Sequence, residues 1–381
     1  PPPPPPPPPS MLRPPPRSTR CTSRRQRQMC IRDRVTMKAG CFTAIATPFM
    51  DDGSVDYDGL DKLGEFQIQN GITGIVAVGT TGESPVLSWD EHNKVIEAIA
   101  KKTKDRCICI AGTGSNNTAE SLEATKHAAK IGADAVLLVD PYYNGPSSLE
   151  IRREYVAPIA AAFPNLKIIP YIIPGRTGAQ MLPEDLAILY NSYPNVNSVK
   201  EATTDVTNMR RTRKCCGDDF VILSGDDGMT YEMMIDPEIK AVGTISVTAN
   251  VAPKALCRMV QVLNEGHQSE AKTLMLKLQP LFSLVTVSTT EKTPYGNVLC
   301  RARNPAAYKA MMSILGMPSG GCRPPLGRLT QNGLNVVLDG LRGVYKNSPE
   351  ILQPIEAFFN VDIGQRLEDP NCWEGLFYKE Y

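Results

Sequence analysis

The sequence from residue 40 to residue 264 repeats one pattern, in which a short apolar run ends in a polar or Gly/Pro cluster and a segment of helical period follows. Strands that alternate with helices form parallel sheets with covered faces. Eight such units over roughly 220 residues predict an α/β fold, the (β/α)8 TIM barrel. A doubly wound open sheet is the alternative, but no Gly-x-Gly-x-x-Gly motif follows the first run. The runs are residues 42–46, 75–78, 107–111, 135–139, 168–173, 196–199, 221–223 and 241–247.

The alternation stops after residue 264. Segments 269–285, 295–315 and 333–345 have a helical period, and we expect no strand between them. The sequence therefore predicts a catalytic barrel at residues 37–265 and a C-terminal helical appendage of about three helices at residues 266–347. A tail of unassigned role follows at residues 348–381, and its aromatic side chains should pack on another part of the protein.

Residues 1–36 differ in composition from the rest of the chain. The segment begins with nine prolines, and residues 1–34 hold eight Arg, no Lys and one acid. Such a segment cannot bury apolar surface, so we expect disorder. We interpret it as a non-native segment before a start at Met37, with a targeting (transit) peptide as the alternative. The expected location is the cytoplasm, or a plastid if the transit peptide is genuine.

Charge and cysteine usage exclude several classes of function. Beyond residue 34 the chain holds 33 Lys and Arg against 39 Asp and Glu, which gives no electrostatic case for binding nucleic acid or a membrane. The eleven cysteines include no CxxC pair, and only three histidines occur. We therefore expect no metal site. No apolar run reaches the ~18 residues of a membrane span.

Polar residues gather where several predicted strands end, which is where barrels of this kind place their active sites. Lys200 is the most unusual of them, because burying an ammonium group on a strand costs several kcal/mol. Desolvation lowers the pKa of a lysine, so that its neutral amine can attack a keto group. Tyrosines could move protons, and an arginine could hold a carboxylate. The clusters are Gly79–Glu83, Asp140–Asn144, Tyr171–Gly178, Lys200–Glu201 and Ser224–Asp227.

Several motifs resemble the dihydrodipicolinate synthase (4-hydroxy-tetrahydrodipicolinate synthase) family, which belongs to the pyruvate-dependent class I aldolase superfamily. The resemblance runs in order from about residue 40 to about residue 329. It implies a lyase of lysine (diaminopimelate) biosynthesis that condenses pyruvate with L-aspartate 4-semialdehyde. It implies no cofactor other than the pyruvate imine on Lys200. The motifs are Gly79-Thr-Thr-Gly-Glu83, Pro141-Tyr-Tyr-Asn144, Tyr171 with Pro174-Gly-Arg-Thr-Gly178, Val199-Lys-Glu-Ala-Thr203, Leu223-Ser-Gly-Asp-Asp227 and Ile245-Ser-Val-Thr-Ala-Asn250.

The resemblance also implies catalytic roles. Lys200 would form the Schiff base with pyruvate, and Tyr171 would be the general acid and base at the imine carbon. Thr80 and Tyr143 would complete a proton relay with Tyr171. Tyr143 would reach in from a neighbouring subunit of a homotetramer, a dimer of dimers.

Substrate binding is implied for four further residues. Thr81 would hold the carboxylate of pyruvate, and Arg176 would bind the carboxylate of aspartate semialdehyde. Gly225 and Ile245 would line the pyruvate pocket through their backbone.

A feedback site for L-lysine at the dimer interface is the last implication. Glu120 would meet the ammonium group, and Trp89 would form an aromatic wall. The alternative is that these are interface residues without regulatory effect. The matching residues are Ser84, Trp89, His92, Asn116, Glu120 and Tyr142.

The sequence departs from the family pattern at two positions, and two other functions stay open. Ile172 stands where the family usually has Asn, which could alter the pocket, and Gly175 stands where many members have Ser. A lyase of the N-acetylneuraminate type is one alternative, which Arg176 opposes. A non-catalytic barrel that binds a metabolite is the other. Such a barrel would not need Lys200, Tyr171, Thr80 and Tyr143 together.

Overall fold

A computed structural model describes residues 37–381. Eight parallel strands form a closed barrel, in which each strand pairs with the next and the eighth pairs with the first. The predicted TIM barrel is therefore confirmed, whereas the expectations for residues 1–36 lie outside the described residues. The strands are β1 (Gly40–Ala44), β2 (Gly74–Ala77), β3 (Ile108–Gly112), β4 (Ala135–Val139), β5 (Lys167–Ile172), β6 (Ser198–Glu201), β7 (Val221–Ser224) and β8 (Gly243–Ser246).

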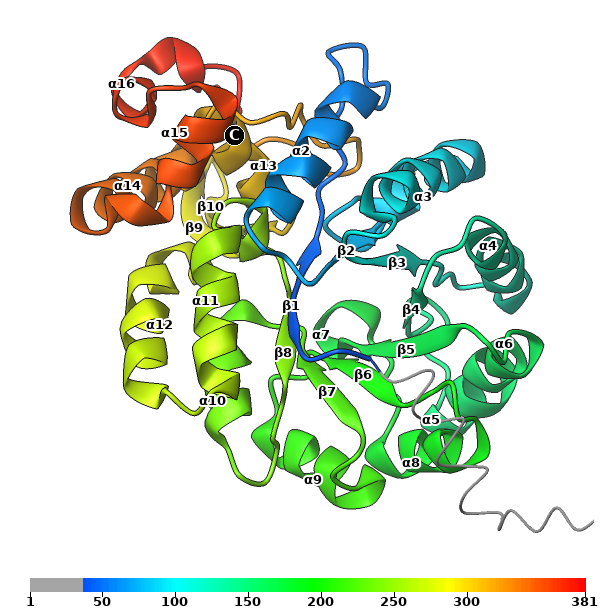
Figure 1. The fold of residues 1–381 in the computed structure, drawn as a ribbon. Coiled ribbons are helices and arrows are strands. Elements are labelled where there is room, and N and C mark those ends of the chain that lie inside the picture. The colour runs from blue at the N-terminus through cyan, green and yellow to red at the C-terminus, as the bar shows by residue number, and fades with distance from the viewer. Residues whose placement is uncertain (1–36) are drawn as a thin grey trace, which may run out of the picture.

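The helices of the repeat surround the barrel (Figure 1). Local sequence sets several of their starts: Ser88 and Glu91 form a capping box, and Pro183 occupies a first helical position. The short α7 (Pro174–Thr177) lies in the loop after β5. The outer helices are α2 (Tyr57–Gln69), α3 (Trp89–Thr103), α4 (Thr118–Lys130), α5 (Ser148–Glu150) continuing through a π-helical turn into α6 (Ala157–Ala162), α8 (Pro183–Ser192), α9 (Val206–Cys216), α10 (Thr230–Ile235) and α11 (Pro253–Asn264).

The strands separate two apolar layers, because successive residues of a strand point to opposite faces. In β5, Ile169 and Tyr171 belong to the cluster inside the barrel, whereas Ile168 and Ile172 belong to the cluster between strands and helices. Val199 of β6 lies in the outer cluster. The next residue, Lys200, is therefore placed on the barrel interior.

A two-stranded antiparallel hairpin interrupts the C-terminal region, so the expectation of no strand there is wrong. β9 (Thr286–Thr293) pairs with β10 (Gly296–Arg303) over their full length. The run is rich in Thr and Val, which favour strands, and Gly296 has a φ of 122° at the turn. One face packs on α14 (Gln331–Asn347). The flanking helices are correspondingly shorter than expected: α12 (Gln268–Phe282) ends before the hairpin, and α13 (Ala306–Ile314) begins after it.

The tail is folded against an early helix. It forms α15 (Gln353–Phe359) and α16 (Ile363–Glu368), which lie with α14 at one side of the barrel, next to α2 (Figure 1). The rings of Phe358 and Phe359 lie 5.4 and 5.3 Å from the ring of Phe66 in α2, centroid to centroid. Arg366 donates to the carbonyl oxygens of Ser313 and Ile314 at the end of α13.

Residues 37–381 contain neither a membrane-spanning helix nor a cluster of metal ligands. No helix has the length and apolar character that a membrane span requires. No group of three or more His, Cys, Asp or Glu side chains is arranged to hold a metal ion.

Candidate active site

Lys200 lies inside the barrel, where it is 4 % exposed. Its strand pairs with β5 so that Lys200 is opposite Tyr171, and its Nζ lies 4.2 Å from the centroid of the Tyr171 ring. Burial lowers the pKa of Lys200 to about 7; the charge of Asp227 opposes this shift and that of Arg176 adds to it. A large share of the amine is therefore neutral, and nucleophilic, near neutral pH.

Gly225 follows β7 and lies against the stem of this lysine. A Cβ at this position would stand 3.0 Å from Cε and Cγ of Lys200 and 2.8 Å from Cβ of Ala202. Any larger residue would displace the lysine side chain. Glycine is thus required for space.

Tyr171 keeps its proton in this environment. Burial raises the pKa of its phenol to about 12, although the charge of Arg176 and a hydrogen bond with the Thr80 side chain act in the opposite direction. A neutral phenol beside a neutral amine can donate a proton to a developing alkoxide and take one back later.

A cavity of about 670 Å³ opens over these groups at the C-terminal ends of the strands. It collects most of the predicted catalytic and substrate residues. Tyr143 is not on its wall and is 86 % exposed, and Ile245 is buried within the barrel interior. The predicted residues on the cavity wall are Thr80, Thr81, Tyr171, Arg176, Lys200 and Gly225.

Asn304, which was not predicted from the sequence, links the two residues expected to bind carboxylates. Its Nδ2 donates to Oγ1 of Thr81 at 3.0 Å, and its carbonyl oxygen accepts from Nη2 of Arg176 at 3.1 Å. It directly follows β10, a segment expected to be helical. The alternation of apolar and polar residues from Cys300 to Arg303 was the local signal for a strand, although it covers only the second half of β10.

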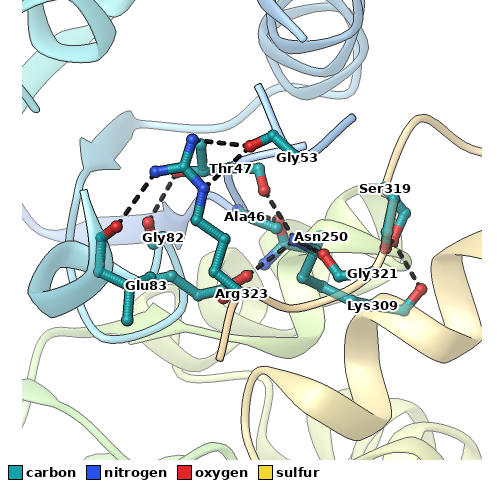
Figure 2. A network of polar contacts seen from close by, with 12 residues as sticks. Ala46, Thr47, Gly53, Gly82, Glu83, Asn250, Lys309, Ser319, Gly321 and Arg323 are labelled. Carbon is teal, nitrogen blue, oxygen red and sulfur yellow. Dashed lines mark hydrogen bonds and ion pairs between the residues drawn. The ribbon is translucent and has the colours of Figure 1, made fainter. Parts of the chain in front are cut away.

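The turn that carries Thr80 and Thr81 is anchored by a buried ion pair. Nζ of Lys309, in α13, lies 2.7 Å from Oε1 of Glu83, and both side chains are almost fully buried. The same ammonium donates to the carbonyl oxygens of Thr47 and Gly321. All three of its N–H groups therefore have partners (Figure 2).

Arg323 completes this network from the other side of Glu83. Its backbone N–H donates to Oε2 of Glu83 at 2.9 Å, and its guanidinium bonds both carboxylate oxygens of Glu91. It also donates to the carbonyl oxygen of Gly53 (Figure 2). Residues from the C-terminal region thus fix the conformation of Glu83, whose φ is 56°.

The residues expected to bind lysine fall into two groups in one chain. Ser84 and Tyr142 line a cavity of about 200 Å³ that also reaches Thr80 and Tyr171. Trp89 and Glu120 line a separate groove between α3 and α4.

The remaining two members of that set lie beside these cavities. Oδ1 of Asn116 accepts the backbone N–H of Tyr142 at 2.6 Å. The ring of His92 meets Trp89 edge-on, and burial lowers the pKa of His92 to about 4.

Neither departure from the family pattern lies against Lys200. Ile172 packs in the outer apolar layer, on the opposite face of β5 from Tyr171, so it does not alter the cavity wall. Gly175 lies at the cavity mouth, and its carbonyl oxygen accepts from Nη1 of Arg303 at 3.2 Å.

Comparisons with known proteins agree on one family. The model of the Dihydrodipicolinate synthetase family matches residues 37–342. A 4-hydroxy-tetrahydrodipicolinate synthase of Methanococcus maripaludis is 39 % identical over 293 residues, which cover 77 % of this chain and 94 % of that protein.

Two solved structures of this kind are similar over about four fifths of this chain. A dihydrodipicolinate synthase of Acinetobacter baumannii complexed with pyruvate has a TM-score of 0.73 and 37 % identity, and covers 81 % of this chain and 99 % of its own. A lysine-bound enzyme of Cyanidioschyzon merolae has a TM-score of 0.73 and 32 % identity, with coverage of 80 % and 98 %. The chain belongs to the dihydrodipicolinate synthase family.

Proposed function

We propose that Lys200 forms an imine with pyruvate and that the derived enamine attacks L-aspartate 4-semialdehyde. The activity is that of the 4-hydroxy-tetrahydrodipicolinate synthases, lyase-type enzymes of lysine biosynthesis. The observation that carries the proposal is a buried lysine with a pKa of about 7 whose amine faces a protonated tyrosine.

The groups around Lys200 fit each step. The neutral amine adds to the keto carbon of pyruvate, Tyr171 protonates the resulting oxygen, and water leaves to give the imine. Loss of a proton from the methyl carbon gives an enamine. The enamine carbon forms a bond with the aldehyde carbon, and the aldehyde oxygen takes up a proton. No further cofactor enters this sequence.

Thr81 is suited to hold the pyruvate carboxylate. Its Oγ1 accepts from Asn304, so its own hydroxyl hydrogen is directed elsewhere and can be donated. Backbone N–H groups of the glycine-flanked turn around it can add further donors. At the mouth, Arg176 can bind the carboxylate of the aldehyde substrate.

Tyr143 is proposed to act on a neighbouring subunit. It is 86 % exposed in this chain, next to Tyr142, which lines the cavity leading to Thr80 and Tyr171. A tyrosine from a second copy could complete the proton relay through that opening. A homotetramer built as a dimer of dimers remains the proposed assembly.

Inhibition by L-lysine is proposed on chemical grounds. Glu120 offers a carboxylate for an ammonium group, Trp89 offers an exposed ring, and the Cyanidioschyzon merolae structure has lysine bound. The two groups of expected lysine-binding residues line separate cavities in one chain. A single site would therefore have to form where two copies of the chain meet.

A cytoplasmic location is also a proposal. The cysteines of residues 37–381 are free thiols, as is usual in a reducing compartment.

Trapping with borohydride tests the proposed chemistry. Incubation with pyruvate and borohydride should leave a reduced adduct on Lys200, located by mass spectrometry. Lys200→Arg should fold but form no adduct. An unmodified Lys200 in the native chain would overturn the imine mechanism. Turnover of aspartate semialdehyde, compared with N-acetylneuraminate, then tests the second substrate.

A further inference from the structure

The hairpin of β9 and β10 places two arginines on the active-site cavity. Arg301 and Arg303 are two residues apart on one strand, so both side chains lie on the same face. Their partners across the hairpin are Ser288 and Thr286, and all four residues line the cavity. The face that turns away packs on α14 through residues such as Val287. The hairpin thus forms part of the cavity wall.

Arg303 lies next to Arg176, the residue expected to bind the aldehyde. Nη1 of Arg303 donates to the carbonyl oxygen of Gly175, and Nη2 of Arg176 donates to the carbonyl oxygen of Asn304. Each arginine thus bonds the backbone beside the other, which keeps the two side chains next to each other. Burial lowers the pKa of Arg176, and the charge of Arg303 adds to this shift.

These arginines have unused hydrogen-bonding capacity. Within residues 37–381, none of Arg176, Arg301 and Arg303 is in an ion pair with a carboxylate. A guanidinium has five N–H donors, and the bond to Gly175 uses one of those of Arg303. Asp226 is a carboxylate on the same wall, but it is in no ion pair with these arginines. It accepts the backbone N–H of Met229 instead.

Adjacent cations without counterions repel each other, and an anion bound between them removes that cost. We propose that Arg303 binds the carboxylate of the aldehyde substrate together with Arg176, and that Arg301 attracts the same anion to the mouth. The ligand class is an aldehyde that carries a carboxylate. This inference rests on the proposed function, because it concerns the second substrate of that reaction.

Steady-state kinetics of hairpin variants test the proposal. Arg303→Ala should raise the KM for aspartate semialdehyde roughly tenfold or more, which is the effect of losing a charge-assisted contact. The KM for pyruvate and the borohydride adduct on Lys200 should stay unchanged. Arg301→Ala should have a smaller effect on the KM for the aldehyde. Lys292→Ala is the matched control, because it removes an exposed charge from the same hairpin outside the cavity.

A second variant separates binding from support of the fold. Arg303→Gln keeps an N–H for Gly175 but loses the charge, and it should raise the aldehyde KM nearly as much as Arg303→Ala. Turnover of an aldehyde without a carboxylate should be equal in the native chain and Arg303→Gln.

Three results would overturn the inference. An aldehyde KM within about twofold of the native value in Arg303→Gln excludes a binding contact. An equal rise of the KM for both substrates indicates a structural role. Absence of the adduct in the native chain overturns the proposed function itself, and the inference with it.

Discussion

At the scale of single residues, the chemistry of this chain depends on how burial acts on two neighbouring groups. The same desolvation that lowers the pKa of Lys200 raises that of Tyr171, because it disfavours the charged form of each. One group therefore loses its proton readily and the other keeps it. This is the combination that imine formation requires.

The first prediction concerns the pH dependence of imine formation. In the proposed mechanism only the neutral amine of Lys200 attacks pyruvate, so the rate of adduct formation should rise through pH 7 and level off above it. Measuring the trapped fraction after short incubations from pH 5.5 to pH 9 checks this. A rate that still rises steeply between pH 8 and pH 9 would mean that Lys200 has the pKa of an exposed lysine.

A second prediction concerns Asn304. In Asn304→Ala the hydroxyl of Thr81 loses the partner that orients it, so the KM for pyruvate should rise several-fold, as for one lost hydrogen bond. Asn297→Ala, in an exposed part of the same hairpin, is the control. An unchanged KM for pyruvate would remove Thr81 from the proposed carboxylate site.

The third prediction concerns stability and pH at Asp140. Burial raises the pKa of this carboxyl to about 7, and the charge of Glu201 adds to the shift. Between about pH 4 and pH 7 the folded chain keeps a proton on Asp140 that the unfolded chain has lost. The free energy of unfolding therefore falls as the pH rises from about 4 to about 7. Asp140→Asn should unfold at higher urea than the native chain at pH 7.5, and the difference should shrink towards pH 4. A difference that is constant with pH contradicts the assignment.

At the scale of elements, the C-terminal region supports the active-site turn. α13 supplies Lys309 to Glu83, and the segment after it supplies Arg323. These contacts lie at the end of the turn that begins with Thr80 and Thr81. The appendage is therefore part of the site, through its buried polar groups as well as through its apolar packing.

The fourth prediction concerns the buried ion pair of Lys309 and Glu83. Lys309→Met leaves the Glu83 carboxylate buried without its counterion, which should cost about 3–5 kcal/mol in the free energy of unfolding. Combining it with Glu83→Gln should restore part of that loss. Lys272→Met on the exposed face of α12 is the control, with almost no effect expected. Denaturant titrations measure all four chains; a loss below about 1 kcal/mol for Lys309→Met would contradict the structural role.

At the scale of the whole molecule, the proposed assembly makes a distinct prediction. If Tyr143 acts on a neighbouring subunit, Lys200→Arg and Tyr143→Ala chains should each be nearly inactive. After mixing and subunit exchange they should regain roughly a quarter of native activity, because half of the dimers are mixed and each has one intact site. Each variant exchanged with itself is the control. No recovery after proven exchange would place Tyr143 outside the partner's site.

The repeating pattern of apolar runs determined the barrel, because a strand or helix of this kind is specified by residues close together in sequence. The position of Lys200 was predictable for the same reason, because it directly follows the sixth apolar run of that pattern and lies within a recognisable motif. The hairpin was not predicted because its apolar positions also fit a helical period. It lies directly between α12 and α13, so its strands read as extensions of those helices. Its stability depends on packing against α14.

Contacts between distant segments were decided by the tertiary structure alone. Asn304 lies 223 residues from Thr81, and Lys309 lies 226 residues from Glu83. No local pattern specifies such pairs, since each polar side chain is acceptable in its own element and finds its partner only when the chain has folded. The sequence thus determined the barrel and the position of the proposed nucleophile inside it. The groups that orient the proposed carboxylate-binding residues became visible only in three dimensions, because burial and long-range hydrogen bonds select them.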